Sequence, residues 1–140
     1  MMRRAGPHVI APLAVALFAA AATAAPATKD AAPRGDAIHG EAIYARCLAC
    51  HAPAYDRTGP RHCGLFGRRA GSVPGFAYSA AMKKAGIVWS ESTLDRFLAN
   101  PLQVVPGTAM GYAGVTDRQE RADLIAYLKR ENASSACTTR

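Results

Sequence analysis

Two of the four cysteines lie three positions apart in the segment RCLACHA, residues 46–52, and a histidine directly follows the second of them. Thiol and imidazole groups at this spacing bind metals, form disulfides or attach cofactors. The 140-residue chain has room for one domain with a modest apolar core, and such a domain often needs a disulfide, a metal or a cofactor for stability. The chemistry of this segment therefore limits the fold more than any other feature.

The order Cys47-x-x-Cys50-His51 is the pattern of c-type haem attachment. Two thiols add to the two vinyl groups of one haem edge, so they lie about one helical turn apart, and the next histidine ligates the iron. Three alternatives remain. A thioredoxin-like pair needs a βαβ context that is not evident, a zinc site needs a second pair such as His62-Cys63, and the two cysteines could form a disulfide.

A thioether opposite the histidine would close the iron to other ligands and raise its reduction potential. Met1 and Met2 lie in the N-terminal segment, and Met82 lies in a predicted short helix. Met110 follows a Pro-Gly turn in VPGTAMGYAG, residues 105–114, which presents one side chain at a defined point. A lone methionine is otherwise often a filler of the core. We expect Met110 to be the second axial ligand.

The N-terminus has the form of a secretory signal peptide. Arg3 and Arg4 precede an apolar stretch, and a small-x-small sequence ends at Ala24. We expect residues 1–24 to be removed and the protein to be periplasmic. The alternatives are a mitochondrial transit peptide, which would be richer in Arg and Ser, and a membrane anchor, which needs about 20 apolar residues. We expect no stable membrane insertion.

Residues 25–34 are predicted to be a flexible lead-in and residues 35–140 to be the folded domain. The net charge is +7, but the basic residues are scattered singly or in pairs. This distribution is not that of a nucleic-acid-binding arm, and it suits attraction to an acidic protein partner.

Periodicity predicts short helices joined by long loops, with no clear strands. The first helix begins at the cap Asp36, runs into Cys47 and has a buried face made of Ile38, Ala42, Ile43 and Ala45. The Gly/Pro-rich stretch 52–88 is predicted to be loop, with a short helix near Ser79 to Lys84. Such a long loop is reasonable in a compact domain if it wraps around a large apolar ligand.

Two further helices follow. Ser90 caps the first of them, Leu94, Phe97 and Leu98 form its apolar stripe, and Pro101 ends it. The last helix runs to Asn132, with a capping box of Thr116 and Gln119 and an apolar face of Leu124, Ile125 and Leu128.

The sequence resembles class I c-type cytochromes, of the mitochondrial cytochrome c and bacterial cytochrome c2 type. The resemblance covers Asp36 to Asn132 in ordered blocks: CLACH, TGPRHCGLFGRRAG, VPGFAYS, GIVWSESTLDRFLANP, VPGTAMGYAG and RADLIAYLK. It implies an all-α fold of three to five short helices and loops wrapped around one covalently bound haem c. It also implies that Gly40, Tyr44 and Leu124 lie where the first and last helices cross.

The resemblance implies a role for several further residues. Cys47 and Cys50 would form the thioethers, and His51 and Met110 would ligate the iron. Pro60 would accept a hydrogen bond from the second ring nitrogen of the histidine. The residues expected beside the haem propionates are Arg68, Tyr78, Trp89 and Thr108, and the aromatic expected at the exposed haem edge is Tyr112.

The sequence departs from the family pattern at the haem edge and near the methionine. Phe97 replaces a tyrosine that donates a hydrogen bond toward the methionine sulfur. Arg46 keeps one of the basic positions around the haem edge. Other residues stand where mitochondrial members of the family have lysines around the haem edge: Leu102, Gln103, Ala109, Thr116 and Asp117. Electrostatic docking is therefore expected to be weaker, or directed at a different partner.

Cys63 and Cys137 lie outside the usual mitochondrial pattern. In an exported protein, this remaining pair is expected to form a disulfide between the C-terminus and the loop after Gly59-Pro60, and two free thiols are the alternative. His39 and His62 are expected to be exposed and structural.

The resemblance implies a soluble, monomeric, one-electron carrier and not an enzyme. Its expected partners are membrane or periplasmic redox proteins that dock at the haem edge: a quinol–cytochrome c reductase as donor, and an oxidase, reductase or photosynthetic reaction centre as acceptor. One alternative is a dedicated redox partner of one periplasmic dehydrogenase. The other is a haem enzyme or gas sensor with an open sixth position, which would need an acid/base group instead of Met110.

Overall fold

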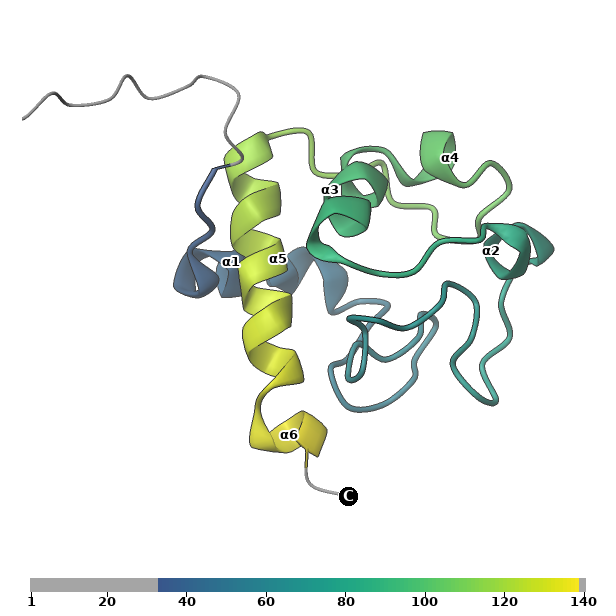
Figure 1. Cartoon of the computed structure of the whole chain (residues 1–140), viewed down its shortest axis with the longest axis horizontal. Helices are drawn as coiled ribbons and strands as arrows, with labels where there is room; N and C mark the ends of the chain where they lie inside the picture. The colour runs from purple at the N-terminus through teal and green to yellow at the C-terminus, as the bar shows by residue number, and fades with distance from the viewer. Residues whose placement is uncertain (1–32, 139–140) are drawn as a thin grey trace, which may run out of the picture. The chain divides into compact units, whose positions relative to one another are not determined.

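The computed structural model describes residues 33–138 of the chain, and this part is helical (Figure 1). The helices are α1 (Ala37–Tyr44), the 3-10 helix η1 (Ala45–Cys47), α2 (Ala80–Lys84), α3 (Glu91–Ala99), α4 (Pro101–Val104), α5 (Arg118–Asn132) and α6 (Ser135–Thr138). Within the described range there is no strand, and one isolated bridge joins Arg69 and Val88. The all-α prediction is confirmed. The predicted signal peptide, residues 1–24, lies outside the described residues.

Helix α5 crosses α1, and this crossing forms one side of the core (Figure 1). A Cβ atom at Gly40 would collide with the backbone carbonyl of Asp123, so the missing side chain permits the close approach. Tyr44 and Leu124 are among the most buried residues, with exposed fractions of 2% and 1%. The predicted contribution of these residues to the crossing is therefore confirmed.

The buried face of α1 differs from the predicted one. Ile38 is 78% exposed, and the predicted partners Ala42 and Ala45 are also exposed. The buried residues are Gly40, Ile43 and Tyr44, so Ile43 is the one member of the predicted face that is buried. The reason is the close contact at Gly40, which turns that side of the helix toward α5 and leaves Ile38 on the outside.

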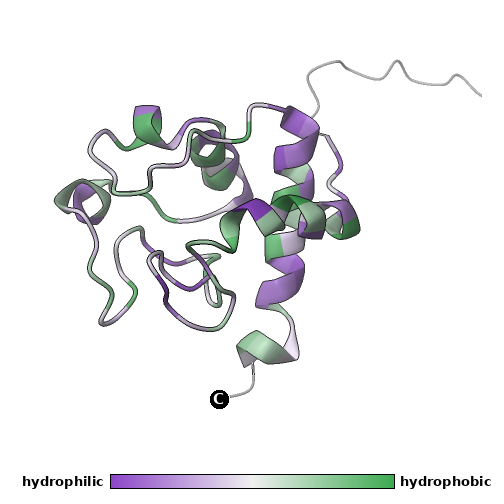
Figure 2. Cartoon of the chain, turned by 180° about the vertical axis from the view of Figure 1, so that it is seen from behind, coloured by the Kyte–Doolittle hydropathy of each residue, from purple (hydrophilic) through white to green (hydrophobic). Residues whose placement is uncertain are grey.

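The start of α5 also differs from the prediction. Asp117, and not Thr116, caps the helix, because its carboxylate accepts a hydrogen bond from the backbone N–H of Glu120 at 2.8 Å. The side chain of Gln119 donates instead to the carbonyl of Arg34 and to Asp123, both at 2.8 Å. The predicted apolar face of Leu124, Ile125 and Leu128 is buried as expected, and Figure 2 shows hydrophilic and hydrophobic stretches alternating along this helix.

The predicted helices before and after residue 88 are present. Ser79 caps α2 by accepting from the N–H of Met82, and Ser90 caps α3 by accepting from the N–H of Thr93. Pro101 follows the end of α3 as predicted, but it also begins α4. The described residues form six α-helices, including the four-residue helices α4 and α6, whereas three to five were predicted. No helix in the described range is long and apolar enough to cross a membrane.

Candidate functional site

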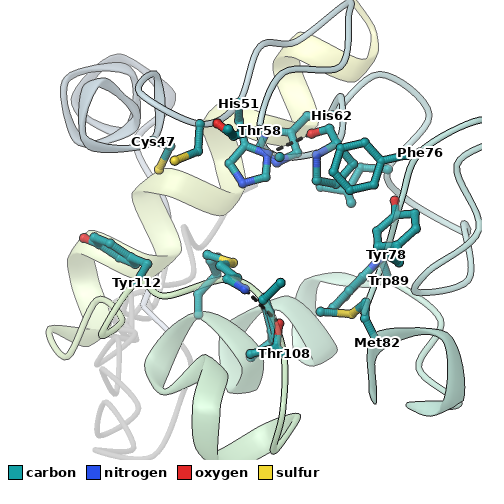
Figure 3. A pocket seen from close by; sticks show the side chains of 18 of the residues that line it. Cys47, His51, Thr58, His62, Phe76, Tyr78, Met82, Trp89, Thr108 and Tyr112 are labelled. Carbon is teal, nitrogen blue, oxygen red and sulfur yellow. Dashed lines mark hydrogen bonds between the residues drawn. The ribbon is translucent and has the colours of Figure 1, made fainter. Parts of the chain in front are cut away.

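The helices and the long loops surround one cavity of about 470 Å³ whose lining is mostly apolar. Figure 3 shows it from close by. The end of α1, η1 and the chain from η1 to α3, including α2, form one part of its wall, and α3, α5 and the segment between α4 and α5 form the rest. All nine residues that the sequence analysis assigned to cofactor binding line it: Cys47, Cys50, His51, Pro60, Arg68, Tyr78, Trp89, Thr108 and Met110.

The two free cysteines enter the cavity from one turn of backbone after α1. The N–H groups of Cys50 and His51 both donate to the carbonyl of Cys47, at 3.0 and 2.9 Å. This turn brings both thiols and the imidazole to the same cavity, and Figure 3 shows Cys47 beside His51. Burial raises the pKa of the Cys47 thiol, while Cys50 is exposed.

The imidazole of His51 is fixed from two directions. Its Nδ1 lies 2.7 Å from the carbonyl oxygen of Pro60 and donates to it. A Cβ atom at Gly59 would collide with the ring, so Gly59 is the residue that allows the loop to lie against it. Burial lowers the pKa of His51 and favours the neutral ring, with 9% of the residue exposed. A neutral imidazole that donates from Nδ1 has a lone pair on Nε2, which is the state that ligates metals.

Met110 lines the same cavity. Thr108 is buried, and its hydroxyl accepts a hydrogen bond from the backbone N–H of Met110 at 3.2 Å. In Figure 3, Thr108 lies across the cavity from His51. The preceding turn requires Gly107, whose φ of +86° is rare for residues with a side chain. The turn therefore fixes where the methionine enters the cavity.

Polar side chains gather at the far end of the cavity. Arg68 donates from its two terminal nitrogens to the carbonyls of Arg61 and Cys63, each at 2.9 Å, and burial lowers its pKa. Trp89 is buried, and its ring packs against that of Phe97 with centroids 5.0 Å apart. Figure 3 shows Trp89 and Tyr78 on the same side of the cavity.

The structure corrects the expectation for His62 and bears out that for His39. His62 is half-buried and lines the cavity, and burial, His51 and Arg68 lower its pKa to about 3. No sequence signal marked this burial, because the ring also contacts Tyr44, which lies 18 positions earlier in the chain. His39 is exposed and contacts Asp123.

Other lining residues that the sequence analysis did not assign to the site are Tyr44, Thr58, Phe76 and Met82. No pattern in the sequence marks them, because their helices and loops come together only in the fold. Met82 is a buried residue on α2, and its side chain points to the part of the cavity near Trp89 in Figure 3.

Cys63 and Cys137 are joined in a disulfide, with Cα atoms 5.1 Å apart. The bridge connects α6 to the loop that follows Pro60. Arg68 donates to the carbonyl of Cys63, so the bridge and the wall of the cavity share this backbone.

The residues present fit a haem. Two free thiols lie one backbone turn apart, an imidazole and a thioether line one mostly apolar cavity, and a guanidinium lines it as well. The described residues contain no group of three or more His, Cys, Asp or Glu side chains that could bind a metal ion. They therefore give no support to the zinc alternative.

The chain is similar to several known proteins, although no family model matches it. Cytochrome c from Sesamum indicum is 47% identical over 91 residues, which are 63% of this chain and 82% of that protein. Cytochrome c2 from Blastochloris viridis is 45% identical over 94 residues, or 65% of this chain and 74% of that protein. The solved structure of cytochrome cH from Methylobacterium extorquens matches this one with a TM-score of 0.67 and 42% sequence identity. The match covers 69% of this chain and 99% of that chain. This chain therefore belongs to the class I cytochrome c family, whose members carry electrons with covalently bound haem c.

Proposed function

We propose that this protein is a periplasmic one-electron carrier with one haem whose iron is ligated by His51 and Met110. The observation that carries the proposal is that Cys47, Cys50, His51 and Met110 line the same apolar cavity. When bound there, haem supplies an iron that alternates between the ferrous and ferric states. The protein contributes attachment, two axial ligands and exclusion of water.

Each member of this set has one role in the proposal. Cys47 and Cys50 form the thioethers, which make the cofactor a permanent part of a small core. His51 donates to Pro60 from Nδ1, so its Nε2 faces the cofactor with its basicity increased. Met110 closes the sixth position with a soft sulfur ligand, which favours the ferrous state.

Arg68, Tyr78, Trp89 and Thr108 are proposed to contact the haem propionates. A buried carboxylate is costly unless donors surround it. Thr108 and Trp89 are buried in the cavity wall, and the guanidinium of Arg68 is oriented by two backbone carbonyls. This preformed arrangement supports the assignment.

The rival activity, a haem enzyme or gas sensor, needs an acid/base group above an open sixth position. Of the described histidines, only His51 and His62 line the cavity, and His62 packs against His51. The cavity lining near Met110 in the sequence consists of Thr108, Ala109, Gly111 and Tyr112. These side chains support a carrier with a closed iron.

Electrons are proposed to enter and leave at the haem edge near Cys50 and Tyr112, through brief docking with other redox proteins. The donor is proposed to be a quinol–cytochrome c reductase, and the acceptor an oxidase, reductase or photosynthetic reaction centre. A dedicated periplasmic dehydrogenase is the second candidate for a partner. It is favoured by the ion pair of Arg46 with Glu120, at 2.7 and 2.8 Å, which neutralises the basic position retained near Tyr112.

The test is a pre-steady-state measurement of reduction by a purified quinol–cytochrome c reductase, followed by oxidation by a terminal oxidase. We expect both steps to be fast, with a rate that depends weakly on salt because most of the family's lysines around the haem edge are absent. The variant Arg46→Ala should change these rates little. Failure of both steps, with rapid turnover of peroxide instead, would exclude the carrier.

The domain boundaries are also part of the proposal: a signal peptide at residues 1–24, a lead-in at residues 25–34 and the haem domain at residues 35–140. The intact mass of the exported protein tests them. It should equal the chain from Ala25 plus one haem, and the native mass should be that of a monomer.

A further inference from the structure

The ring of His62 stacks on the ring of His51. Their centroids are 4.4 Å apart and their planes are inclined by 20°. Haem attachment requires the CxxCH sequence, and the proposed iron ligands are His51 and Met110, so neither explains a second imidazole at this place. The stacked ring lies directly against the residue proposed as the iron ligand.

The ring of His62 is itself fixed by a hydrogen bond. Its Nδ1 lies 3.0 Å from the hydroxyl oxygen of Tyr44, whose ring is buried between α1 and α5. Tyr44 also packs against Tyr127, with centroids 4.9 Å apart. The orientation of His62 is therefore tied to the helix crossing and not only to its own loop.

The backbone of His62 is fixed as well. Its N–H lies 3.2 Å from the carbonyl of Ala52 and 3.1 Å from that of Pro53, the two residues that follow His51. Arg68 donates to the carbonyls of both residues adjacent to His62. Together these contacts hold the backbone of His62 beside the turn that carries His51.

We propose that His62 is a positioning residue for His51 and that it lowers the reduction potential of the haem. The inference rests on the ligation by His51 proposed above. The stacked ring restricts rotation of His51, together with Gly59 and the Pro60 carbonyl. It is also a dipolar, polarisable group beside a ligand that becomes more positive in the ferric state. Such a neighbour stabilises the ferric state more than an aliphatic side chain does.

The test replaces His62 by leucine, which has a similar size but no dipole and no aromatic face. The potential of the holoprotein is measured by equilibrium titration, and the proton NMR shifts of the haem methyl groups report the orientation of His51. We expect His62→Leu to shift the potential upward and to change the methyl shifts. An unchanged potential, or a downward shift, would overturn the inference.

A matched control separates this effect from a general loss of stability. His39→Leu makes the same chemical change at an exposed histidine that does not line the cavity. It removes a hydrogen bond between α1 and α5, so it should lower the midpoint of unfolding without moving the potential. A potential that moves equally in both variants would show that stability, and not the stacked ring, is responsible.

Tyr44→Phe provides a second route if His62→Leu does not bind haem. The variant keeps the aromatic packing but frees the ring of His62 from its hydrogen bond. We expect altered haem methyl shifts and a smaller upward shift of the potential, and unchanged values of both would overturn the inference. All variants should keep the weak red absorption of a methionine-ligated ferric iron. Its absence from the unmodified protein would instead contradict the proposed ligation.

Discussion

At the scale of single residues, the orientation of His51 depends on one carbonyl and one missing side chain. Pro60 accepts the hydrogen bond of Nδ1, and Gly59 leaves the space that the ring occupies. Both residues lie in one short loop, whose position is fixed by a hydrogen bond of 2.7 Å from the N–H of Gly59 to the carbonyl of Cys50. The loop is therefore hydrogen-bonded to the CxxCH turn at Cys50 and also holds the imidazole of His51.

We expect Gly59→Ala to displace either the ring of His51 or the loop, because the new Cβ atom would collide with the ring. Overpacking of this kind destabilises a fold by roughly 1–3 kcal/mol. Denaturant unfolding of the holoprotein should show this loss, and the optical spectrum should change with it. The control Gly75→Ala has a Cβ with nothing within 4 Å and adds only the strain of a positive φ. Gly75→Ala should leave the spectrum unchanged, and an equal spectral change in both variants would contradict the account.

Much of the site could be predicted at this scale, because covalent attachment and iron ligation require fixed residue types at fixed spacings. Cys47, Cys50 and His51 were predicted in this way, Met110 was predicted from the Pro-Gly turn before it, and the structure brings all four to one cavity. The burial of His62 could not be predicted. It depends on Tyr44, which lies 18 positions earlier on another helix. A histidine in a loop gives no signal of such a contact.

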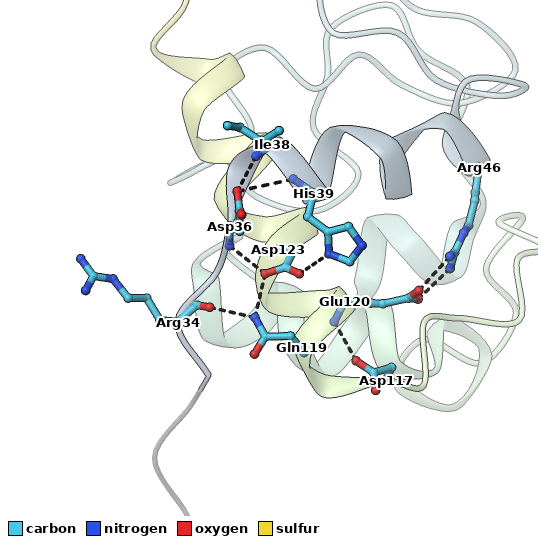
Figure 4. Close-up of polar contacts among 9 residues, drawn as sticks. All are labelled: Arg34, Asp36, Ile38, His39, Arg46, Asp117, Gln119, Glu120 and Asp123. Atoms are coloured by element: carbon cyan, nitrogen blue, oxygen red, sulfur yellow. Dashed lines mark hydrogen bonds and ion pairs between the residues drawn. The ribbon is translucent and has the colours of Figure 1, made fainter. Parts of the chain in front are cut away.

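At the scale of secondary structure elements, the contact between α1 and α5 includes a buried carboxylate. Figure 4 shows Asp123 accepting hydrogen bonds from the backbone N–H of Asp36, the side chain of Gln119 and Nδ1 of His39, at 2.7, 2.8 and 2.7 Å. Asp123 is 2% exposed, so these donors compensate for its loss of solvation. The network fixes the start of α1 on the surface of α5.

The pH dependence of stability should report this network. The hydrogen bond with Asp123 raises the pKa of His39 above its ordinary value of 6.5, with further contributions from the charges of Asp36 and Glu120. A raised pKa in the folded state contributes stability that is complete below pH 6.5 and is lost as the pH rises through the folded value. We expect the free energy of unfolding, relative to that of His39→Gln, to fall as the pH increases above 6.5. A difference that stays constant or grows over this range would contradict the assignment.

The sequence predicted the main helices and the caps Asp36 of α1 and Ser90 of α3 correctly, but it misplaced the cap of α5. Thr116 with Gln119 has the spacing of a capping box, yet Gln119 is used by Asp123 and Arg34. Asp117 then provides the cap one residue later. Local rules placed the helices, and a contact with a distant segment decided where one of them begins.

At the scale of the whole molecule, two features hold distant segments together: the cavity proposed to bind haem and the disulfide. The bridge between Cys63 and Cys137 spans 74 positions of the chain, from the loop after Pro60 to α6. The sequence suggested this pairing only through the leftover cysteines and the expected compartment. The path of the chain past α5 explains why the two residues meet.

Removal of the bridge should destabilise the protein without changing the haem spectrum. The chain-entropy estimate for a loop of this length is about 4 kcal/mol. We expect a smaller loss, because the haem attachment already restricts part of the chain. The double variant Cys63→Ser with Cys137→Ser should show a lower midpoint of thermal unfolding. With the iron ferrous in both proteins before the comparison, a disulfide reductant should lower the midpoint of the unmodified protein to that of the variant and leave the variant unaffected. Alkylation of both cysteines without reductant, detected by mass, would show that no bridge exists.

The central claim of this account is that Met110 and His51 close the iron of a single haem. The most direct test is the absorption spectrum of the purified holoprotein, first ferric and then ferrous under carbon monoxide, with Met110→Ala as the control. The account predicts a weak red sulfur-to-iron band in the ferric protein and no binding of carbon monoxide to the ferrous protein, and both properties should be reversed in Met110→Ala. A missing band with rapid binding of carbon monoxide in the unmodified protein would contradict the claim and favour an enzyme or a gas sensor.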